Sequence, residues 1–107
     1  MKYGLTQLVI TKIQNVFKEH SEISQVILYG SRALSTNRDN SDIDLTIKTN
    51  RDVSVEFLLS LKSELDDLMI PYMIDISLFK NIDNQALLDH INRVGIIFFE
   101  SSKVAQA

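Results

Sequence analysis

Apolar residues recur along the chain with two different spacings, and together they predict alternating helices and strands. Helical spacing, with apolar positions three or four apart, covers three segments: residues 5–20, 52–69 and 84–95. Apolar or alternating runs that favour strands cover four more: residues 24–30, 41–48, 71–79 and 96–100. A short helix can begin at Ser31, directly after the first of these runs ends at Gly30. This order predicts an α+β domain, a mixed α/β arrangement built on a small mixed sheet.

Strict alternation in the second and third strands predicts what each face of the sheet carries. One face is apolar in both strands: Ile43, Leu45, Ile47, Ile74, Ile76 and Leu78. The opposite face carries three carboxylates: Asp42, Asp44 and Asp75. Helices are expected to cover the apolar face. If the two strands are neighbours in the sheet, the three carboxylates converge on one open patch.

Composition narrows the class of protein. The length of 107 residues favours one domain over residues 1–107, with a polar tail from residue 101 that we expect to fray. The chain has no cysteine, which excludes disulfides and thiolate metal sites. A formal net charge of -3 gives no long-range attraction to nucleic acid or anionic membrane, so a bound polyanion must be held locally. With no apolar run of roughly 20 residues and no signal-peptide pattern, we expect a soluble cytoplasmic protein.

The three aspartates have the chemistry of a metal site. Asp42 and Asp44 stand two positions apart on a strand, so their side chains project to one side with origins roughly 7 Å apart. Carboxylates this close, with Asp75 beside them, repel one another unless a cation lies between them. Mg²⁺ is usually held by one or two carboxylates together with substrate phosphates. Two such ions form a clamp used in phosphoryl and nucleotidyl displacement.

Gly30 and Ser31 supply a complementary anion site. Gly30 ends a strand, and its missing side chain allows phosphate oxygens to approach the backbone. Ser31 begins a short helix, whose free N–H groups and serine hydroxyl can donate to an anion. Together these groups can hold a polyphosphate while the aspartates hold its metal.

Residues 28–47, "LYGSRALSTNRDNSDIDLTI", contain Gly-Ser, ten intervening residues and then Asp42-Ile43-Asp44. This spacing resembles the signature of the nucleotidyltransferase superfamily related to DNA polymerase beta, and in particular its minimal nucleotidyltransferases. Asp75, within "IDIS", matches that family's third metal-binding aspartate in kind and in order along the chain. The sequence departs from the family at Ser35, where a second glycine is common, and a residue with a side chain there is expected to stiffen or reshape the loop over the phosphates.

The resemblance implies transfer of AMP from magnesium-bound ATP to a hydroxyl acceptor, with release of pyrophosphate. Asp42 and Asp44 would bind both of two Mg²⁺ ions, and Asp75 would bind the catalytic ion and help to activate the acceptor. Gly30 and Ser31 would hold the β- and γ-phosphates. Arg32 would add a phosphate contact, although an arginine at a turn is also often simply solvated.

The resemblance also implies a partner. Minimal nucleotidyltransferases are typically paired with a helical HEPN-type toxin, and in characterised pairs the transferase is the antitoxin, of type VII, that adenylylates a tyrosine of the toxin. The apolar run "VGIIFF", residues 94–99, is a candidate docking edge or plain core. Two alternatives stay open: a binding module that neutralises its partner by contact alone, and transfer to a small molecule such as an aminoglycoside.

Two other binding motifs are excluded, and the two histidines, Tyr29 and Met73 are interpreted as structural residues. An EF-hand fails because no glycine follows Asp44 at the required position, and no Gly-Lys-Ser/Thr is present for a Walker-type loop. We expect His20 and His90 to be solvated rather than to bind metal. Tyr29 and Met73 are expected to pack, although either could border a nucleotide.

Overall fold

The computed structural model describes residues 1–101. Apart from Ser101, the predicted polar tail therefore lies outside the described residues. The elements are α1 (Gln7–Lys18), β1 (Ile23–Tyr29), α2 (Ser31–Leu34), β2 (Ile43–Thr49), α3 (Val55–Asp66), β3 (Ile74–Leu78), the 3₁₀ turn η1 (Phe79–Asn81), α4 (Gln85–Val94) and β4 (Ile96–Glu100). Every predicted helix and strand is present among these residues, with ends that differ by a few positions.

The four strands of the described chain form one mixed sheet in the order β3-β2-β1-β4. β1 is antiparallel to both of its neighbours, β2 and β4, whereas β2 and β3 are parallel. A parallel pair needs a crossover connection, and α3 provides it. The mixed-sheet prediction is confirmed, and the second and third strands are indeed neighbours.

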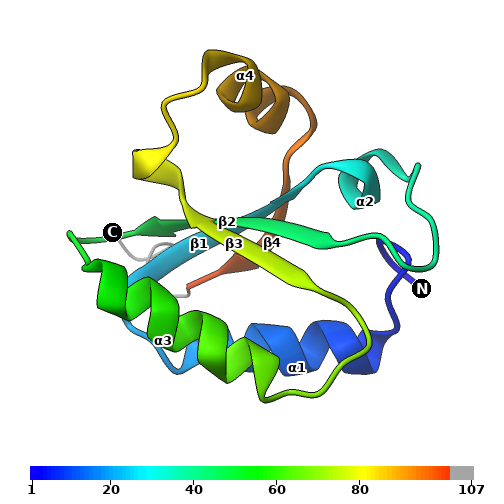
Figure 1. The fold of residues 1–107 in the computed structure, drawn as a ribbon, viewed down its shortest axis with the longest axis horizontal. Coiled ribbons are helices and arrows are strands. Elements are labelled where there is room, and N and C mark those ends of the chain that lie inside the picture. The colour runs from blue at the N-terminus through cyan, green and yellow to red at the C-terminus, as the bar shows by residue number, and fades with distance from the viewer. Residues whose placement is uncertain (102–107) are drawn as a thin grey trace.

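The main core lies between the sheet and the two long helices, α1 and α3, which run along one face (Figure 1). α1 contributes Ile13 and Phe17, both 0% exposed, and α3 contributes Leu61, also 0% exposed. Ile43 and Leu45 of β2 meet them from the sheet and are likewise 0% exposed. No helix within residues 1–101 is long and apolar enough to cross a bilayer.

Side-chain caps define where the three longer helices begin. Thr6 accepts the N–H of Val9, as predicted for α1. Of the two candidates for α3, Ser54 is the cap, and it accepts the N–H of Phe57 at 3.2 Å. Asn84 does the same for α4. Local sequence signals therefore fix these starts.

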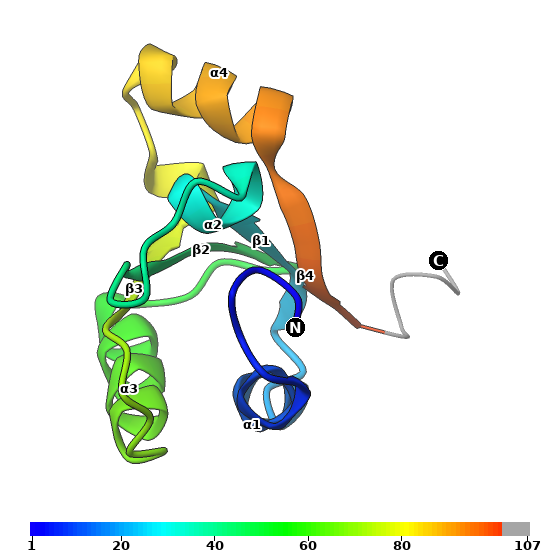
Figure 2. The same ribbon diagram turned by 90° about the vertical axis from the view of Figure 1, so that its right-hand side faces the viewer.

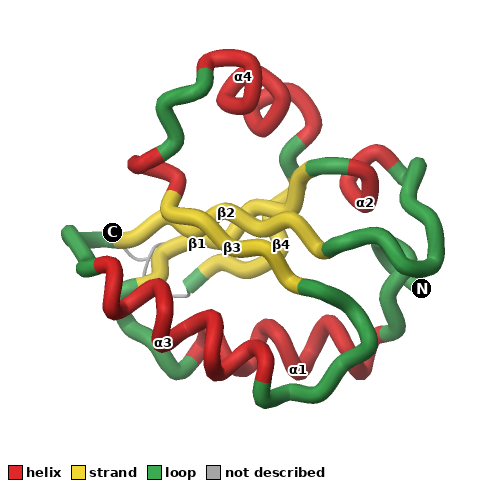
Figure 3. Tube along the Cα trace, viewed as in Figure 1, coloured by secondary structure: helices red, strands yellow, loops and turns green. Residues whose placement is uncertain are grey.

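α4 lies on the other side of the sheet from α1 and α3, and the short α2 lies on the same side as α4 (Figure 2). In the tube view the sheet separates the two layers of helices (Figure 3). The expectation that helices cover one face thus holds for α1 and α3 but not for α4. Ile91 of α4 is 2% exposed, and Gly95 at its end lies against Ile27 of β1. An apolar stripe on α4 therefore covers part of the second face, above β1.

Candidate active site

Asp44 of β2 and Asp75 of β3 are paired residues in the parallel ladder. The preceding pair, Ile43 and Ile74, is 0% and 4% exposed and faces the core. Because side chains alternate along a strand, both carboxylates project to the opposite face, the side on which α4 lies. The structure thus places two of the three predicted aspartates side by side.

Asp42 precedes β2 by one residue and is exposed, whereas Asp44 is half-buried. The pKa of Asp44 is raised from its ordinary value, first by burial and then by the negative charges of Asp75 and Asp42. His90 and then Arg32 act in the opposite direction and partly oppose this rise in the pKa. All three aspartates therefore contribute to one region of negative potential.

The donor set suits Mg²⁺ in kind, because hard cations prefer carboxylate oxygens. Within residues 1–101, no group of three His, Asp or Glu side chains is placed so that it could hold a metal ion by itself. Mg²⁺ usually completes its shell with water and substrate phosphates rather than with an all-protein cage. The residues present thus fit a magnesium–nucleotide site, and their assignment as metal ligands stays a prediction.

Gly30 connects β1 to α2 with φ of 75° and ψ of -156°, a conformation that residues with a side chain rarely adopt. A Cβ atom at this position would also collide with the carboxylate of Asp44. Glycine is therefore favoured here by the backbone conformation, and any side chain would also displace the Asp44 carboxylate. Its absence of a side chain brings the Gly30–Ser31 corner directly against Asp44.

Ser35 ends α2 in a left-handed conformation, with φ of 60° and ψ of 28°. Its N–H donates to the carbonyl of Ser31, and the N–H of Thr36 donates to the same carbonyl at 2.9 Å. Glycine is favoured in this conformation, which explains why a glycine would suit the position. Serine here retains the turn at some cost in backbone strain.

His90 is a site residue that the sequence analysis missed. The N–H of Gly30 donates to Nε2 of His90 at 3.1 Å, and the His90 ring meets the Tyr29 ring edge-on at 6.2 Å between centroids. His90 therefore touches the glycine-serine corner rather than being solvated. The available signal was its spacing, because it lies three residues after Leu87 and four before Val94, on the apolar side of α4.

Arg32 is buried, with 1% of its surface exposed. Its guanidinium donates to the backbone carbonyl of Ser41 through Nε (3.2 Å) and Nη2 (2.7 Å), and to that of Tyr3 through Nη1 (2.9 Å). These donors are directed to the protein rather than to the open face. The predicted phosphate contact of Arg32 stays a prediction that this arrangement does not favour.

Two further residues border the carboxylates. Tyr29 is half-buried, and its pKa is raised by burial, with a hydrogen bond to Ser77 lowering it and the charges of Asp44 and Asp75 raising it. Tyr29 thus packs as expected. Met73, two residues before Asp75, is 69% exposed and does not enter the core.

The residues predicted as a docking edge divide between core and surface. β4 is an edge strand of the sheet. Phe98 is 3% exposed and packs edge-on against Phe17, whereas Ile97 is 55% exposed. Phe98 therefore belongs to the core, and the docking interpretation rests on exposed residues such as Ile97.

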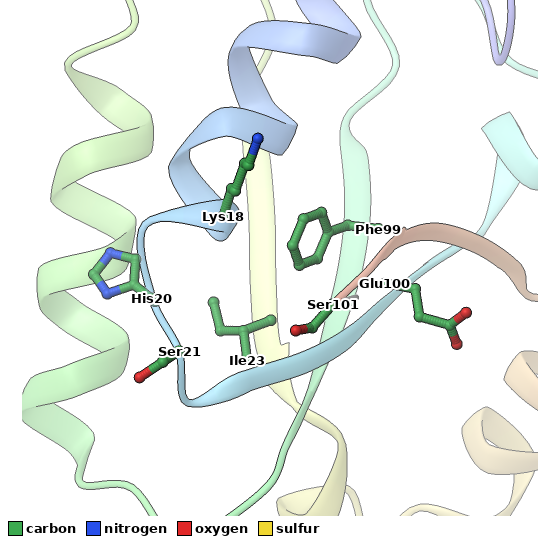
Figure 4. Close-up of a pocket in the computed structure, with 7 residues that line it drawn as sticks. All are labelled: Lys18, His20, Ser21, Ile23, Phe99, Glu100 and Ser101. Atoms are coloured by element: carbon green, nitrogen blue, oxygen red, sulfur yellow. The ribbon is translucent and has the colours of Figure 1, made fainter. Parts of the chain in front are cut away.

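A pocket of about 430 Å³ lies at the opposite end of β1 from Gly30, between α1 and β4 (Figure 4). Lys18, His20 and Phe99 are among its lining residues. His20 is already engaged there, because its Nε2 lies 2.9 Å from a carboxylate oxygen of Glu64. None of the predicted site residues lines this pocket, so the carboxylate face is the better candidate for chemistry.

The family model described as "Polymerase beta, Nucleotidyltransferase" matches residues 11–104, which span both the glycine-serine corner and all three aspartates. The chain belongs to this nucleotidyltransferase family. No curated protein sequence matches it significantly. The recognition of the family from the signature in residues 28–47 and Asp75 is thus confirmed.

Solved structures with the same fold include toxin–antitoxin complexes. A toxin–antitoxin with AMP-PNP matches at a TM-score of 0.71 and 16% identity, over 91% of this chain and 77% of that one. The complex of a tri-AMPylated Shewanella oneidensis HEPN toxin with an MNT antitoxin matches at a TM-score of 0.68 and 14% identity, over 95% and 78%. A toxin-antitoxin MntA-HepT structure matches at 0.67 and 16%, over 94% and 78%. At these identities the likeness shows a shared fold.

Proposed function

We propose that this protein is a Mg²⁺-dependent adenylyltransferase that transfers AMP from ATP to a hydroxyl group of a partner protein. The observation that carries the proposal is the pairing of Asp44 with Asp75 on the sheet face that Gly30 also borders. Membership in the family supports nucleotidyl transfer as the reaction type. The fold shared with a toxin–antitoxin crystallised with AMP-PNP supports an adenine nucleotide.

The predicted residues divide the work of binding. Asp42 and Asp44 would hold two Mg²⁺ ions, and Asp75 would hold the ion nearer the acceptor. The N–H of Gly30 already donates to His90, so we assign the β- and γ-phosphate contact chiefly to the Ser31 hydroxyl and N–H. Gly30 contributes by leaving room for the phosphate oxygens to approach the backbone.

The reaction is an in-line displacement at the α-phosphorus of ATP. When bound, Mg²⁺ neutralises phosphate charge and polarises the α-phosphorus. The acceptor oxygen forms a bond to that phosphorus, and the bond to the oxygen bridging the α- and β-phosphates breaks, so pyrophosphate leaves with the electron pair. Asp75 is exposed and lies on β3, an edge strand, where it can take the acceptor's proton and where a large acceptor can approach.

The acceptor that we propose is a tyrosine of a HEPN-type helical toxin, with this chain as its antitoxin. Two matched structures support this assignment: the tri-AMPylated HEPN toxin in complex with an MNT antitoxin, and the MntA-HepT pair. An exposed Asp75 beside the exposed Met73 also suits an acceptor that is itself a protein surface.

The direct test incubates the chain with ATP labelled at the α-phosphate, Mg²⁺ and a co-expressed HEPN-type protein as the proposed partner. We expect label on a tyrosine of that protein, located by mass spectrometry of its peptides. Asp42→Asn, Asp44→Asn and Asp75→Asn should each reduce labelling by at least about 100-fold, because each removes a charge that the transition state needs. Asp66→Asn, an exposed carboxylate on α3, is the matched control and should label at the wild-type rate.

Two other outcomes would each replace the proposal. Neutralisation of the toxin that survives all three aspartate changes, with no label transferred, would mean that the chain acts by contact alone. Label that appears on a small hydroxyl or amine compound, but not on the protein, would mean a small-molecule transferase.

A further inference from the structure

The Arg32 side chain joins its own segment to three others, at Tyr3, Ser41 and Tyr72. It follows Ser31 directly, and its guanidinium donates twice to the carbonyl of Ser41, the residue before Asp42. Its Cζ lies 4.8 Å from the centre of the Tyr72 ring, three residues before Asp75. A third hydrogen bond reaches the carbonyl of Tyr3. The buried guanidinium of Arg32 thus connects the Gly30–Ser31 corner with the segments that lead into β2 and β3.

The N-terminal turn is shaped to receive this guanidinium. Tyr3 and Gly4 both have positive φ, 58° and 72°, and the turn is closed by paired hydrogen bonds between Lys2 and Leu5. A Cβ atom at Gly4 would come within 2.9 Å of Nη1 of Arg32 and would also collide with the Asn37 side chain. Gly4 therefore leaves the space into which Arg32 and the loop between α2 and β2 fit.

We propose that Arg32 is a positioning residue that sets Asp42 and Asp75 relative to the Gly30–Ser31 corner. It does so through Ser41 on one side and Tyr72 on the other, with the turn at Tyr3 and Gly4 as its support. We call the contacts of Arg32 with Tyr3, Ser41 and Tyr72 the Arg32 clamp. The role of this clamp in nucleotide binding rests on the proposed function, whereas the contacts themselves do not. Lysine cannot replace it, because only a planar guanidinium donates through two nitrogens to one carbonyl while stacking on a ring.

The clamp is tested first in the metal-free protein by amide hydrogen exchange. Arg32→Lys and Arg32→Ala should raise exchange in residues 36–42 and 2–5. Gly4→Ala, which displaces the Arg32 side chain without removing it, should raise exchange in the same segments. If Arg32→Ala fails to fold, Gly4→Ala and Arg32→Lys are compared instead. Leu65→Ala, a core change on α3 that removes none of the Arg32 hydrogen bonds, is the control for a general loss of stability. Unchanged exchange in residues 36–42 of the Arg32 variants would overturn the clamp, whether or not the protein binds nucleotide.

The positioning role is then tested by calorimetric titration with Mg²⁺ and a non-hydrolysable ATP analogue. Removing a residue that orients metal ligands typically weakens binding on the order of 10- to 100-fold, and we expect that loss for Arg32→Lys. Leu65→Ala, with a comparable fall in melting temperature, should bind as the wild type does. Wild-type affinity in Arg32→Lys, together with a loosened loop, would overturn the positioning role. Absence of binding by the wild type would refute the proposed function and with it this role, leaving the exchange result to decide the clamp.

Discussion

Asp44 and Asp75 are neighbours in register across the parallel β2–β3 ladder, and both project away from the main core. Burial and the charge of Asp75 raise the pKa of Asp44, and Asp42 adds to the same effect. A cation placed among these groups would relieve their repulsion and restore the ionised form. We therefore expect this pair to link the stability of the protein to pH and, if Mg²⁺ binds as proposed, to the metal.

Asp44→Asn should stabilise the metal-free protein at neutral pH. Because the pKa of Asp44 is raised in the folded state, the folded protein holds this proton more tightly than the unfolded chain does. The stability that the protonated carboxyl contributes is present below the unfolded pKa, about 4, and is lost as the pH rises through the folded value. Melts in EDTA should show the variant's gain at about pH 7.5 and little gain at about pH 3.

The same variant separates metal binding from general charge effects. Mg²⁺ should raise the melting temperature of the wild type and of Asp66→Asn, but not that of Asp44→Asn. An equal response of all three proteins to Mg²⁺ would show that the ion acts elsewhere.

Gly30→Ala should lower the free energy of unfolding by about 1–3 kcal/mol, the range for a side chain forced into such a backbone conformation. Part of this loss comes from the collision of the new Cβ with the Asp44 carboxylate, and part from the positive φ. Urea denaturation of Gly30→Ala, Asp44→Ala and the double variant separates the two parts. The double variant should be more stable than the sum of the single effects predicts, and strict additivity would contradict the contact.

His90→Ala should loosen the glycine-serine corner. The Gly30 N–H loses its acceptor, so its amide exchange should accelerate and the protein should lose about 1 kcal/mol of stability. His90→Gln, which keeps an acceptor oxygen on the side chain, should restore part of the protection. Asp89→Ala, one residue away and exposed on the same helix, is the control. Protection at Gly30 that is unchanged in His90→Ala would show that this hydrogen bond is not populated in solution.

Ser35→Gly should stabilise the protein, in contrast to most serine-to-glycine changes. Its left-handed conformation costs a residue with a side chain about 1 kcal/mol, more than glycine loses in chain entropy. A rise of up to about 4–8 °C in the melting temperature is expected for a domain of this size. Leu34→Gly, inside the right-handed turn of α2, should instead lower it. A lower melting temperature for Ser35→Gly would mean that the serine makes a contact that outweighs its strain.

Local patterns predicted the helices and strands. They also predicted that Asp44 and Asp75 lie on the face of the sheet opposite the main core. Alternation in residues 41–48 and 71–79 separated the buried isoleucines from Asp44 and Asp75, and capping residues marked the helix starts. Two side chains have surroundings that the local pattern did not predict: Arg32 is buried, which does not favour its predicted phosphate contact, and His90 accepts a hydrogen bond from Gly30. Both side chains have partners that come from other segments of the chain.

The sequence by itself determined the side to which each strand residue points, because a strand's period of two residues is a local property of the backbone. It also determined that a Gly-Ser pair follows the first strand and that two aspartates lie at the start of the second. Only the tertiary structure decided that β2 and β3 pair in parallel with Asp44 opposite Asp75, that α4 crosses to their side, and that Arg32 turns inward. These arrangements join residues as many as 60 positions apart, as between Gly30 and His90, and they depend on how the elements pack rather than on any local repeat.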